Sequence, residues 1–312
     1  MMPQGPLFAL PLLALGADLV LGDPQGWPHP VRWLGRVAHG LEAWARRSGG
    51  GLRWRGALCA WGLALGAGTL AWGAASLPLV GWLLALYLAY AGLALGSLLS
   101  EGRKVLALVE AGNLSGARQA VAMLVSRDTS GMNEEEICRA LAETLSENLC
   151  DGLVAPFFYL AFLGPAGLWG YKAVSTLDSM WGYRTEPWRE LGWAAARTDD
   201  VLAFVPARLT AVFIVLCGRV LFGRRVSLRV VRDDARRMES PNAGWPMAAA
   251  AWVVQGTMGG RTVYFGVSKD KPVLGPEGRP WMCRQLRQLL RLVTVSGVCC
   301  ALALWLGAWL WS

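Results

Sequence analysis

Long apolar runs alternate with polar, mostly basic segments along this chain. Most of the runs approach 20 residues, the length that a helix needs to cross the roughly 30 Å hydrocarbon core of a bilayer. They cover residues 6–22, 56–75, 78–99, 152–172, 201–222 and 292–311. In lipid, only helices and closed barrels satisfy every backbone polar group. We therefore predict an all-α polytopic membrane protein with about four to six transmembrane or re-entrant helices, organised as a single membrane domain over residues 1–312.

The run 152–172 is interrupted. Pro156 and the pair Gly164-Pro165 fall inside it, and a proline removes a helical hydrogen bond and clashes with the preceding turn. Non-helical backbone at membrane depth survives only where protein or a water-filled cavity covers it. The sequence therefore predicts a broken or re-entrant helix here.

Residues 127–151 are polar and acidic, and they predict a helix of another kind. Asn133 is a favourable N-cap, and Glu136 stands three residues later, where a capping box places its acid. An apolar stripe recurs at four-residue steps through Ile137, Leu141, Leu145 and Leu149. A second stripe is acidic and contains Glu136, Glu143, Glu147 and Asp151. Like charges one turn apart repel, so this face is either solvated or binds cations.

Composition supports the membrane class. Charged residues make up 17% of the chain and hydrophobic residues 54%, whereas a soluble domain is about 25% charged. The formal net charge of +8 indicates positive-inside loops and attraction to anionic headgroups or substrates. No nucleic-acid-binding module is recognisable. The seven cysteines include no C-x-x-C pair, so we expect reduced, packed thiols without a disulfide or zinc framework.

The polar segments 22–54, 100–151 and 223–291 are expected to build the functional site on the cytoplasmic face. The last two carry five and thirteen of the 30 Lys and Arg residues, and the positive-inside rule places such segments in the cytoplasm. The number and orientation of the spans stay open at this point, because 152–172 and 201–222 are both irregular.

Three polar features are candidates for binding. Arg127-Asp128-Thr129-Ser130 supplies a cation and hydroxyls just before a helix N-terminus, a natural seat for phosphate, although it also suits an ordinary polar turn. Glu147-Asn148-x-x-Asp151, with Glu143 one turn earlier, would suit Mg²⁺, which takes oxygen ligands and shares them with phosphates. The alternative is a solvated helix face.

Arg208 lies inside an apolar run and should have an anionic partner. Asp199, Asp200 or a substrate phosphate are the candidates.

Two further residues have two interpretations. Asp18 near the end of the first apolar run is either a functional intramembrane acid or a side chain that reaches the interface. His29 lies between two prolines, and an isolated histidine is usually not a ligand. The sequence contains no Walker, dinucleotide or H-E-x-x-H motif.

Five stretches resemble the adenosylcobinamide-phosphate synthase family, the integral membrane synthases of cobalamin biosynthesis. They are ADLVLGDPQGWPHPVRWLGR, SRDTSGMNEEEICRALAETLSENLCDGLVAPFFYLAFLGPAGLWGYKAVSTLDSMWGYR, GWAAARTDDVLAFVPARLTA, SPNAGWPMAAAAW and GGRTVYFG. The resemblance runs from about residue 17 to 275 in the expected order, and collectively the motifs are highly specific. Cys150 stands where similar sequences often have a small polar residue such as serine.

The resemblance implies a ligase that forms a carbon–nitrogen amide bond. Such enzymes join a propionate carboxylate of adenosylcobyric acid to (R)-1-amino-2-propanol O-phosphate, or to free aminopropanol, giving adenosylcobinamide phosphate. ATP as co-substrate and Mg²⁺ would supply the driving force, and the setting would be the cell inner membrane with a cytoplasmic active face. The partners implied are the corrinoid, the amine, the lipid bilayer and other cobalamin-pathway enzymes, with no nucleic acid.

By chemistry we assign metal binding to Glu143, Glu147 and Asp151. The other expected catalytic residues are Lys172, Asp178, Asp199 and Asp200. The expected substrate- and phosphate-binding residues are His29, Arg127, Asp128, Thr129, Ser130, Asn148, Arg184, Arg208 and Asn242. Two other function classes stay open: a metal-dependent membrane phosphotransferase or prenyltransferase, and a non-catalytic corrinoid-binding scaffold or transporter.

Overall fold

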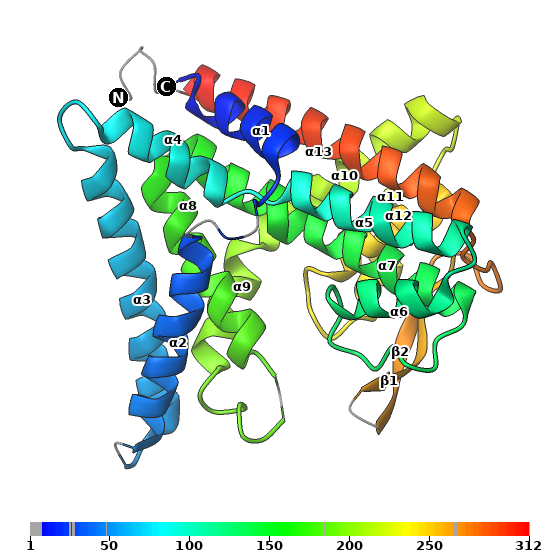
Figure 1. Ribbon diagram of the computed structural model, residues 1–312, viewed down its shortest axis with the longest axis horizontal. Coiled ribbons are helices and arrows are strands. Elements are labelled where there is room, and N and C mark those ends of the chain that lie inside the picture. The colour runs from blue at the N-terminus through cyan, green and yellow to red at the C-terminus, as the bar shows by residue number, and fades with distance from the viewer. Residues whose placement is uncertain are drawn as a thin grey trace. The chain divides into compact units, whose positions relative to one another are not determined.

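The computed structural model describes residues 8–24, 26, 29–47, 49–183, 185–264 and 267–311 (Figure 1). The chain forms two compact units that alternate along the sequence. Unit 1 comprises residues 1–94, 151–203 and 301–312, and unit 2 comprises residues 95–150 and 204–300.

Unit 1 is helical throughout its described elements. They are α1 (Leu10–Leu21), α2 (Pro30–Arg47), α3 (Leu52–Ala75), α4 (Gly81–Ala91), most of the π-helical turn η1 (Cys150–Val154), α8 (Ala155–Trp181), α9 (Trp193–Leu202) and the last turns of α13 (Cys283–Trp311). Helix α3 packs along α8 and α9, α2 packs on α8 and α3, and α1 packs on α4. Their buried core contains Ala38, Ala45, Cys59, Ala60, Leu177, Trp181, Leu191 and Ala195.

Close backbone approach explains the small residues in this core. A Cβ atom at Gly56 of α3 would lie 2.0 Å from the carbonyl oxygen of Leu191, and one at Gly192 would lie 1.8 Å from that of Trp181. Only glycine permits such contacts, which let α3, α8 and the start of α9 pack tightly.

The predicted break in 152–172 is confirmed. Helix α8 runs through this segment, but Gly164 has φ 67° and ψ −163°, outside the helical region, directly before Pro165. Pro156 lies at the start of α8, where a missing N–H costs little.

Unit 2 is built around the predicted acidic helix, which is observed as α7 (Glu134–Leu149). The capping box is present, since Asn133 accepts from the N–H of Glu136 and Glu136 accepts from that of Asn133. The apolar stripe is fully buried at Ile137, Leu141, Leu145 and Leu149. Helix α7 packs against α5 (Leu95–Glu110), α6 (Leu114–Ala122), α12 (Gly244–Val254) and β1 (Met258–Tyr264).

The segment 223–291, treated above as a loop, is largely structured. It contains α11 (Leu228–Ala235), α12, and an antiparallel hairpin of β1 and β2 (Val267–Leu274), and it leads into α13. The short alanine-rich α12 is buried on nearly every side, so no polar face announces it in the sequence. It packs on α10 (Phe204–Phe222), α11 and both strands.

Among the described residues, five stretches of helix are long and apolar enough to cross a membrane. They are Leu52–Ala75, Gly81–Glu110, Glu134–Trp181, Phe204–Phe222 and Cys283–Trp311. The predicted all-α, polytopic membrane class is therefore confirmed. The first apolar run differs, because α1 has only 12 residues and spans about 18 Å.

Candidate functional site

The central charged group of unit 1 is Lys172, which projects from α8. Three carboxylates act electrostatically on it, in decreasing order Asp151, Asp23 and Asp18. Asp18 is completely buried, so the interpretation of this residue as a side chain that reaches the interface is wrong. The acids come from α1, the turn that follows it and η1, which the packing of α1 and α8 brings together. Unit 1 therefore gathers charges from distant parts of the sequence around one ammonium group.

Asp199 of α9 is the second charged centre of unit 1. Burial raises the pKa of this carboxyl to about 8. This value also includes the effect of three neighbouring carboxylates, in decreasing order Asp151, Asp178 and Asp200. The Oδ1 atom of Asp199 is buried and has no hydrogen-bond partner among the described residues. A partly buried carboxylate with spare acceptor capacity and a pKa near neutrality is suited to take up a proton.

Three more contacts border these charged residues. The Nε2 atom of His29 lies 3.3 Å from Oδ1 of Asp23. The hydroxyl of Tyr90 in α4 donates to the backbone carbonyl of Gly22, which ties the turn after α1 to α4. Asp200 lies 3.6 Å from Arg197 through its Oδ2 atom.

The structure brings together in unit 1 five residues that the sequence analysis proposed for the site. They are Asp151, Lys172, Asp178, Asp199 and Asp200.

Two members of the acidic stripe, Glu143 and Glu147, lie on α7 in unit 2, close to positively charged side chains. Glu143 is 2% exposed and accepts from the guanidinium of Arg127 and, at 2.8 Å, from the backbone N–H of Gly259. Glu147 lies among the charges of Lys271, Glu143 and Arg127. The buried pair of Arg127 and Glu143 therefore anchors the start of the β hairpin to α7.

The described residues contain no group of three or more His, Cys, Asp or Glu side chains that could hold a metal ion. Glu143 already has two donors, so the arrangement does not fit a metal centre built from three protein carboxylates. The assignment of Glu143, Glu147 and Asp151 to metal stays a prediction without support from this geometry.

The Arg127–Ser130 segment forms a hydrogen-bonded turn. Ser130 donates to Oδ1 of Asp128 through its N–H at 2.9 Å and its hydroxyl at 2.8 Å, and these bonds lower the pKa of Asp128. The Thr129 hydroxyl donates to the carbonyl of Arg118 at 3.1 Å. Each side chain of this segment thus has a partner inside unit 2, as the polar-turn interpretation requires.

Arg208 of α10 is bound by neutral groups. Its Nη1 atom donates to the side-chain oxygen of Asn242 at 3.0 Å and to the carbonyl of Phe204 at 2.7 Å. Its guanidinium carbon lies 3.4 Å from the ring centroid of Phe204 and 4.8 Å from that of Trp245. No ion pair of Arg208 with a carboxylate occurs in the part of the chain that the structure describes. The guanidinium charge therefore stays available to an anion.

Two remaining candidates add little. The side chain of Asn148 donates to the carbonyl of Thr144 at 3.0 Å, one turn back on α7. Arg184 lies outside the described residues.

Sequence reasoning missed or undervalued three acids. Asp18 and Asp23 lie in the ADLVLGDP stretch, whose two acids beside an apolar run were the available signal. Asp234 of α11 is 6% exposed and accepts from Arg237, from Nε1 of Trp252 at 2.8 Å and from the N–H of Gly275 at 2.8 Å. In a run of alternating charges, nothing distinguished it from its exposed neighbours.

Comparison with known proteins gives the family. The family model described as "CobD/Cbib protein" matches residues 11–293. The chain is 36% identical to the "Cobalamin biosynthesis protein CobD" of Klebsiella pneumoniae, covering 94% of this chain and 95% of that protein. It is 39% identical to the protein of that name from Pelobacter propionicus over 90% and 89% of the two chains, and 38% identical to the "Cobalamin biosynthesis protein CbiB" of Salmonella arizonae over 94% and 95%. No solved structure matches.

These matches extend over nearly the whole chain and confirm the resemblance found in its motifs. The chain belongs to the CobD/CbiB family of cobalamin biosynthesis proteins.

Proposed function

We propose that this protein is an ATP-dependent ligase that joins a propionate carboxylate of adenosylcobyric acid to (R)-1-amino-2-propanol O-phosphate or to aminopropanol. The product would be adenosylcobinamide phosphate or its unphosphorylated counterpart. The family resemblance supports this reaction, and the observation that carries it is the partly buried charge cluster of unit 1, in which Lys172 and Asp199 are surrounded by carboxylates.

Amide formation in water needs an activated carboxyl group and a neutral amine. ATP meets the first need if its γ-phosphoryl group passes to the propionate oxygen, giving an acyl phosphate and ADP. The amine nitrogen then attacks the acyl carbon, the C–O bond to phosphate breaks, and inorganic phosphate leaves. A primary amine is mostly an ammonium ion at pH 7, so one proton must be removed for this attack.

Asp199 is suited to remove that proton. Its ionised carboxylate would attract the substrate ammonium, and its unpartnered Oδ1 atom provides the acceptor. A pKa of about 8 lies closer to that of an amine than an ordinary carboxyl does, so the transfer costs less free energy.

Lys172 is suited to bind the other reactant. Its ammonium group would hold the carboxylate or the departing phosphate, with Asp151, Asp23 and Asp18 orienting it. Mg²⁺ would accompany the nucleotide and shield its phosphates, which commonly requires only one or two protein carboxylates. We place this chemistry at the cytoplasmic face of the inner membrane, where ATP is available and where basic segments are retained.

The test uses purified protein in detergent with cobyric acid, each amine in turn and ATP-Mg²⁺, followed by mass spectrometry. We expect the amide product, with loss of at least 99% of turnover in Asp199→Asn. Asp233→Asn serves as the control, since Asp233 is an exposed acid of unit 2 paired only with the adjacent Arg232.

Two results would overturn the proposal. A lipid-linked product that forms without corrinoid would indicate the phosphotransferase class, and corrinoid binding without ATP consumption would indicate a scaffold.

A further inference from the structure

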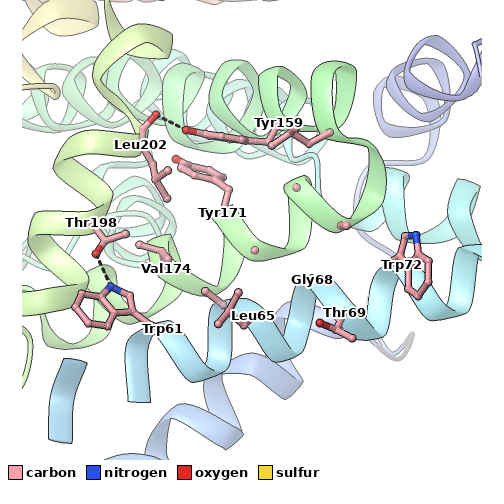
Figure 2. A pocket seen from close by; sticks show the side chains of 15 residues that line it. Trp61, Leu65, Gly68, Thr69, Trp72, Tyr159, Tyr171, Val174, Thr198 and Leu202 are labelled. Carbon is pink, nitrogen blue, oxygen red and sulfur yellow. Dashed lines mark hydrogen bonds between the residues drawn. The ribbon is translucent and has the colours of Figure 1, made fainter. Parts of the chain in front are cut away.

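A groove of about 750 Å³ lies on unit 1 between α3, α8 and α9. Figure 2 shows Trp61, Leu65 and Trp72 along its α3 side and the tyrosines of α8 opposite. Small residues keep it open: a Cβ atom at Gly68 would lie 3.1 Å from the carbonyl oxygen of Ala166. The groove is a product of close helix packing at small residues, as in other membrane helices.

The walls suit hydrocarbon. Two of the polar side chains that line the groove bond to the protein itself: Nε1 of Trp61 donates to Oγ1 of Thr198 at 3.1 Å, and the hydroxyl of Tyr159 donates to the carbonyl of Leu202 at 2.9 Å (Figure 2). The rings of Tyr159 and Tyr171 stack at 5.1 Å and present an apolar floor. A strongly polar ligand would find few donors or acceptors left to bind.

The groove has the length of one membrane leaflet. The α3 residues that line it run from Trp61 to Trp72, a rise of about 16 Å along a helix. Half of a roughly 30 Å hydrocarbon core is about 15 Å. Only 22% of the most apolar window of α3 is buried inside the structure, so this helix presents most of its surface, and the groove with it, to lipid.

Two arginines lie beyond one end of the groove: Arg197 directly precedes the lining residue Thr198, and Arg53 stands eight residues, about 12 Å along α3, before the lining residue Trp61. Arg53, at the start of α3, places its guanidinium carbon 3.9 Å from the ring centroid of Trp193. Arg197 follows Trp193 by four residues on α9 and therefore shares its face. The Arg197 side chain is 66% exposed, and its ion pair among the described residues is with the partly exposed Asp200 at 3.6 Å; such pairs near the surface contribute little. Arginine and tryptophan at the end of a membrane span are typical of the headgroup region.

We propose that this groove binds one acyl chain of an anionic phospholipid, whose phosphate lies against Arg53 and Arg197. The apolar walls, the length of one leaflet and the two cations beyond one end all match a single lipid molecule. The lipid stabilises the packing of α3 on α8 and α9 and takes no part in the reaction, so this inference is independent of the proposed ligase activity.

The test is native mass spectrometry of the full-length protein, stripped of lipid in detergent and titrated with phosphatidylglycerol or phosphatidylcholine. We expect phosphatidylglycerol to bind at least tenfold more tightly. Arg53→Gln combined with Arg197→Gln should remove this preference, since each cation near an anionic headgroup favours binding by a factor of about five. The control is Arg224→Gln combined with Arg225→Gln, which removes the same charge from exposed positions of unit 2.

A second variant tests the acyl chain. Thr69→Trp adds a ring to an exposed position that lines the groove, and it should weaken both lipids at least tenfold. If that variant fails to fold, Leu65→Trp, at a 72% exposed lining position, replaces it. Glycerol 3-phosphate alone should not compete, because the acyl chain contributes most of the affinity.

Three results would overturn the proposal. They are equal affinity of the wild-type protein for the two lipids, unchanged binding in the groove-filling variant, and full competition by glycerol 3-phosphate. A stable dimer whose mass excludes lipid would show that a second copy of the chain covers the groove instead.

Discussion

The two units treat buried charge in opposite ways. In unit 2, Glu143 and Asp234 each accept from an arginine and from at least one N–H group. In unit 1, Asp199 keeps a buried oxygen without a partner in the described chain, and carboxylates crowd around Lys172. A saturated buried charge holds a fold together, whereas a crowded and unsaturated one costs stability and indicates function. The comparison separates structural acids from candidate catalytic ones within a single chain.

The largest effect is expected at Glu143. Glu143→Gln leaves the guanidinium of Arg127, whose side chain is only 7% exposed, without its counter-charge, which typically costs about 3–5 kcal/mol. Thermal unfolding in detergent should show a large loss of stability. Exposed Glu101→Gln is the control, because its contact with Lys104 is a surface pair at 3.7 Å. A stable Glu143→Gln protein that has lost only activity would reverse our division of the two units.

Asp199→Asn should reduce turnover by two orders of magnitude or more, equivalent to about 3 kcal/mol in the barrier, without loss of folding. In the wild-type protein the base must be ionised, so turnover should rise with pH through about 8, the pKa of Asp199. The variant should lose this rise in its pH–rate profile. An unchanged profile in Asp199→Asn would assign proton removal to another group.

Stability provides an independent measure of the same carboxyl. Because its folded pKa of about 8 exceeds its unfolded value of about 3.9, the folded protein retains this proton as pH rises. The stabilisation of the folded protein by this retained proton is therefore fully present below about pH 4 and is lost as the pH rises to 8. Asp199→Asn should flatten that part of the curve of stability against pH, and a wild-type curve without such a slope would contradict the burial of this charge.

The acidic stripe sharpens the comparison further. If Glu147 and Asp151 share Mg²⁺, Glu147→Gln and Asp151→Asn should each lower turnover about a hundredfold, and added Mg²⁺ or Mn²⁺ should restore part of it. If the charges of Arg127 and Lys271 around Glu147 are structural, Glu147→Gln should lose stability with an unchanged Mg²⁺ requirement. Measuring rate against Mg²⁺ concentration in both variants distinguishes the two roles.

Arg208 should show the smallest effect. Arg208→Leu removes a guanidinium that Asn242 and two rings position without neutralising it. We expect the KM for the phosphorylated amine to rise about tenfold, equivalent to about 1.4 kcal/mol, with less change for free aminopropanol. An equal rise for both amines would show that Arg208 only fixes the turn that carries Asn242.

Local features of this fold could be predicted from sequence because neighbouring residues cause them. The capping box at Asn133, the buried stripe of α7 and the break at Gly164 depend on spacings of a few residues. The hairpin of β1 and β2 and the buried α12 were missed, since a glycine-rich stretch and an alanine run have no distinctive periodicity.

In the candidate site, too, groupings that depend on local sequence could be predicted, and contacts between distant segments could not. Asp178, Asp199 and Asp200 could be grouped from their acidic context, and the structure places them in one cluster. The inclusion of Asp18 required the packing of α1 and α8, which no local pattern encodes. Glu143 looked like a cation ligand because its buried partners, Arg127 and Gly259, lie 16 and 116 residues away.

The alternation of the two units along the chain also orders the events of biosynthesis. Residues 301–312 belong to unit 1. They are synthesised only after residues 204–300, the second part of unit 2, have been made. At about 5–20 residues per second, that interval lasts roughly 5–20 s. During this time the earlier helices of unit 1 lack the last turns of α13. The ribosome therefore completes unit 2 first, and an insertion machinery or chaperone that protects unit 1 has its longest opportunity while those residues are translated.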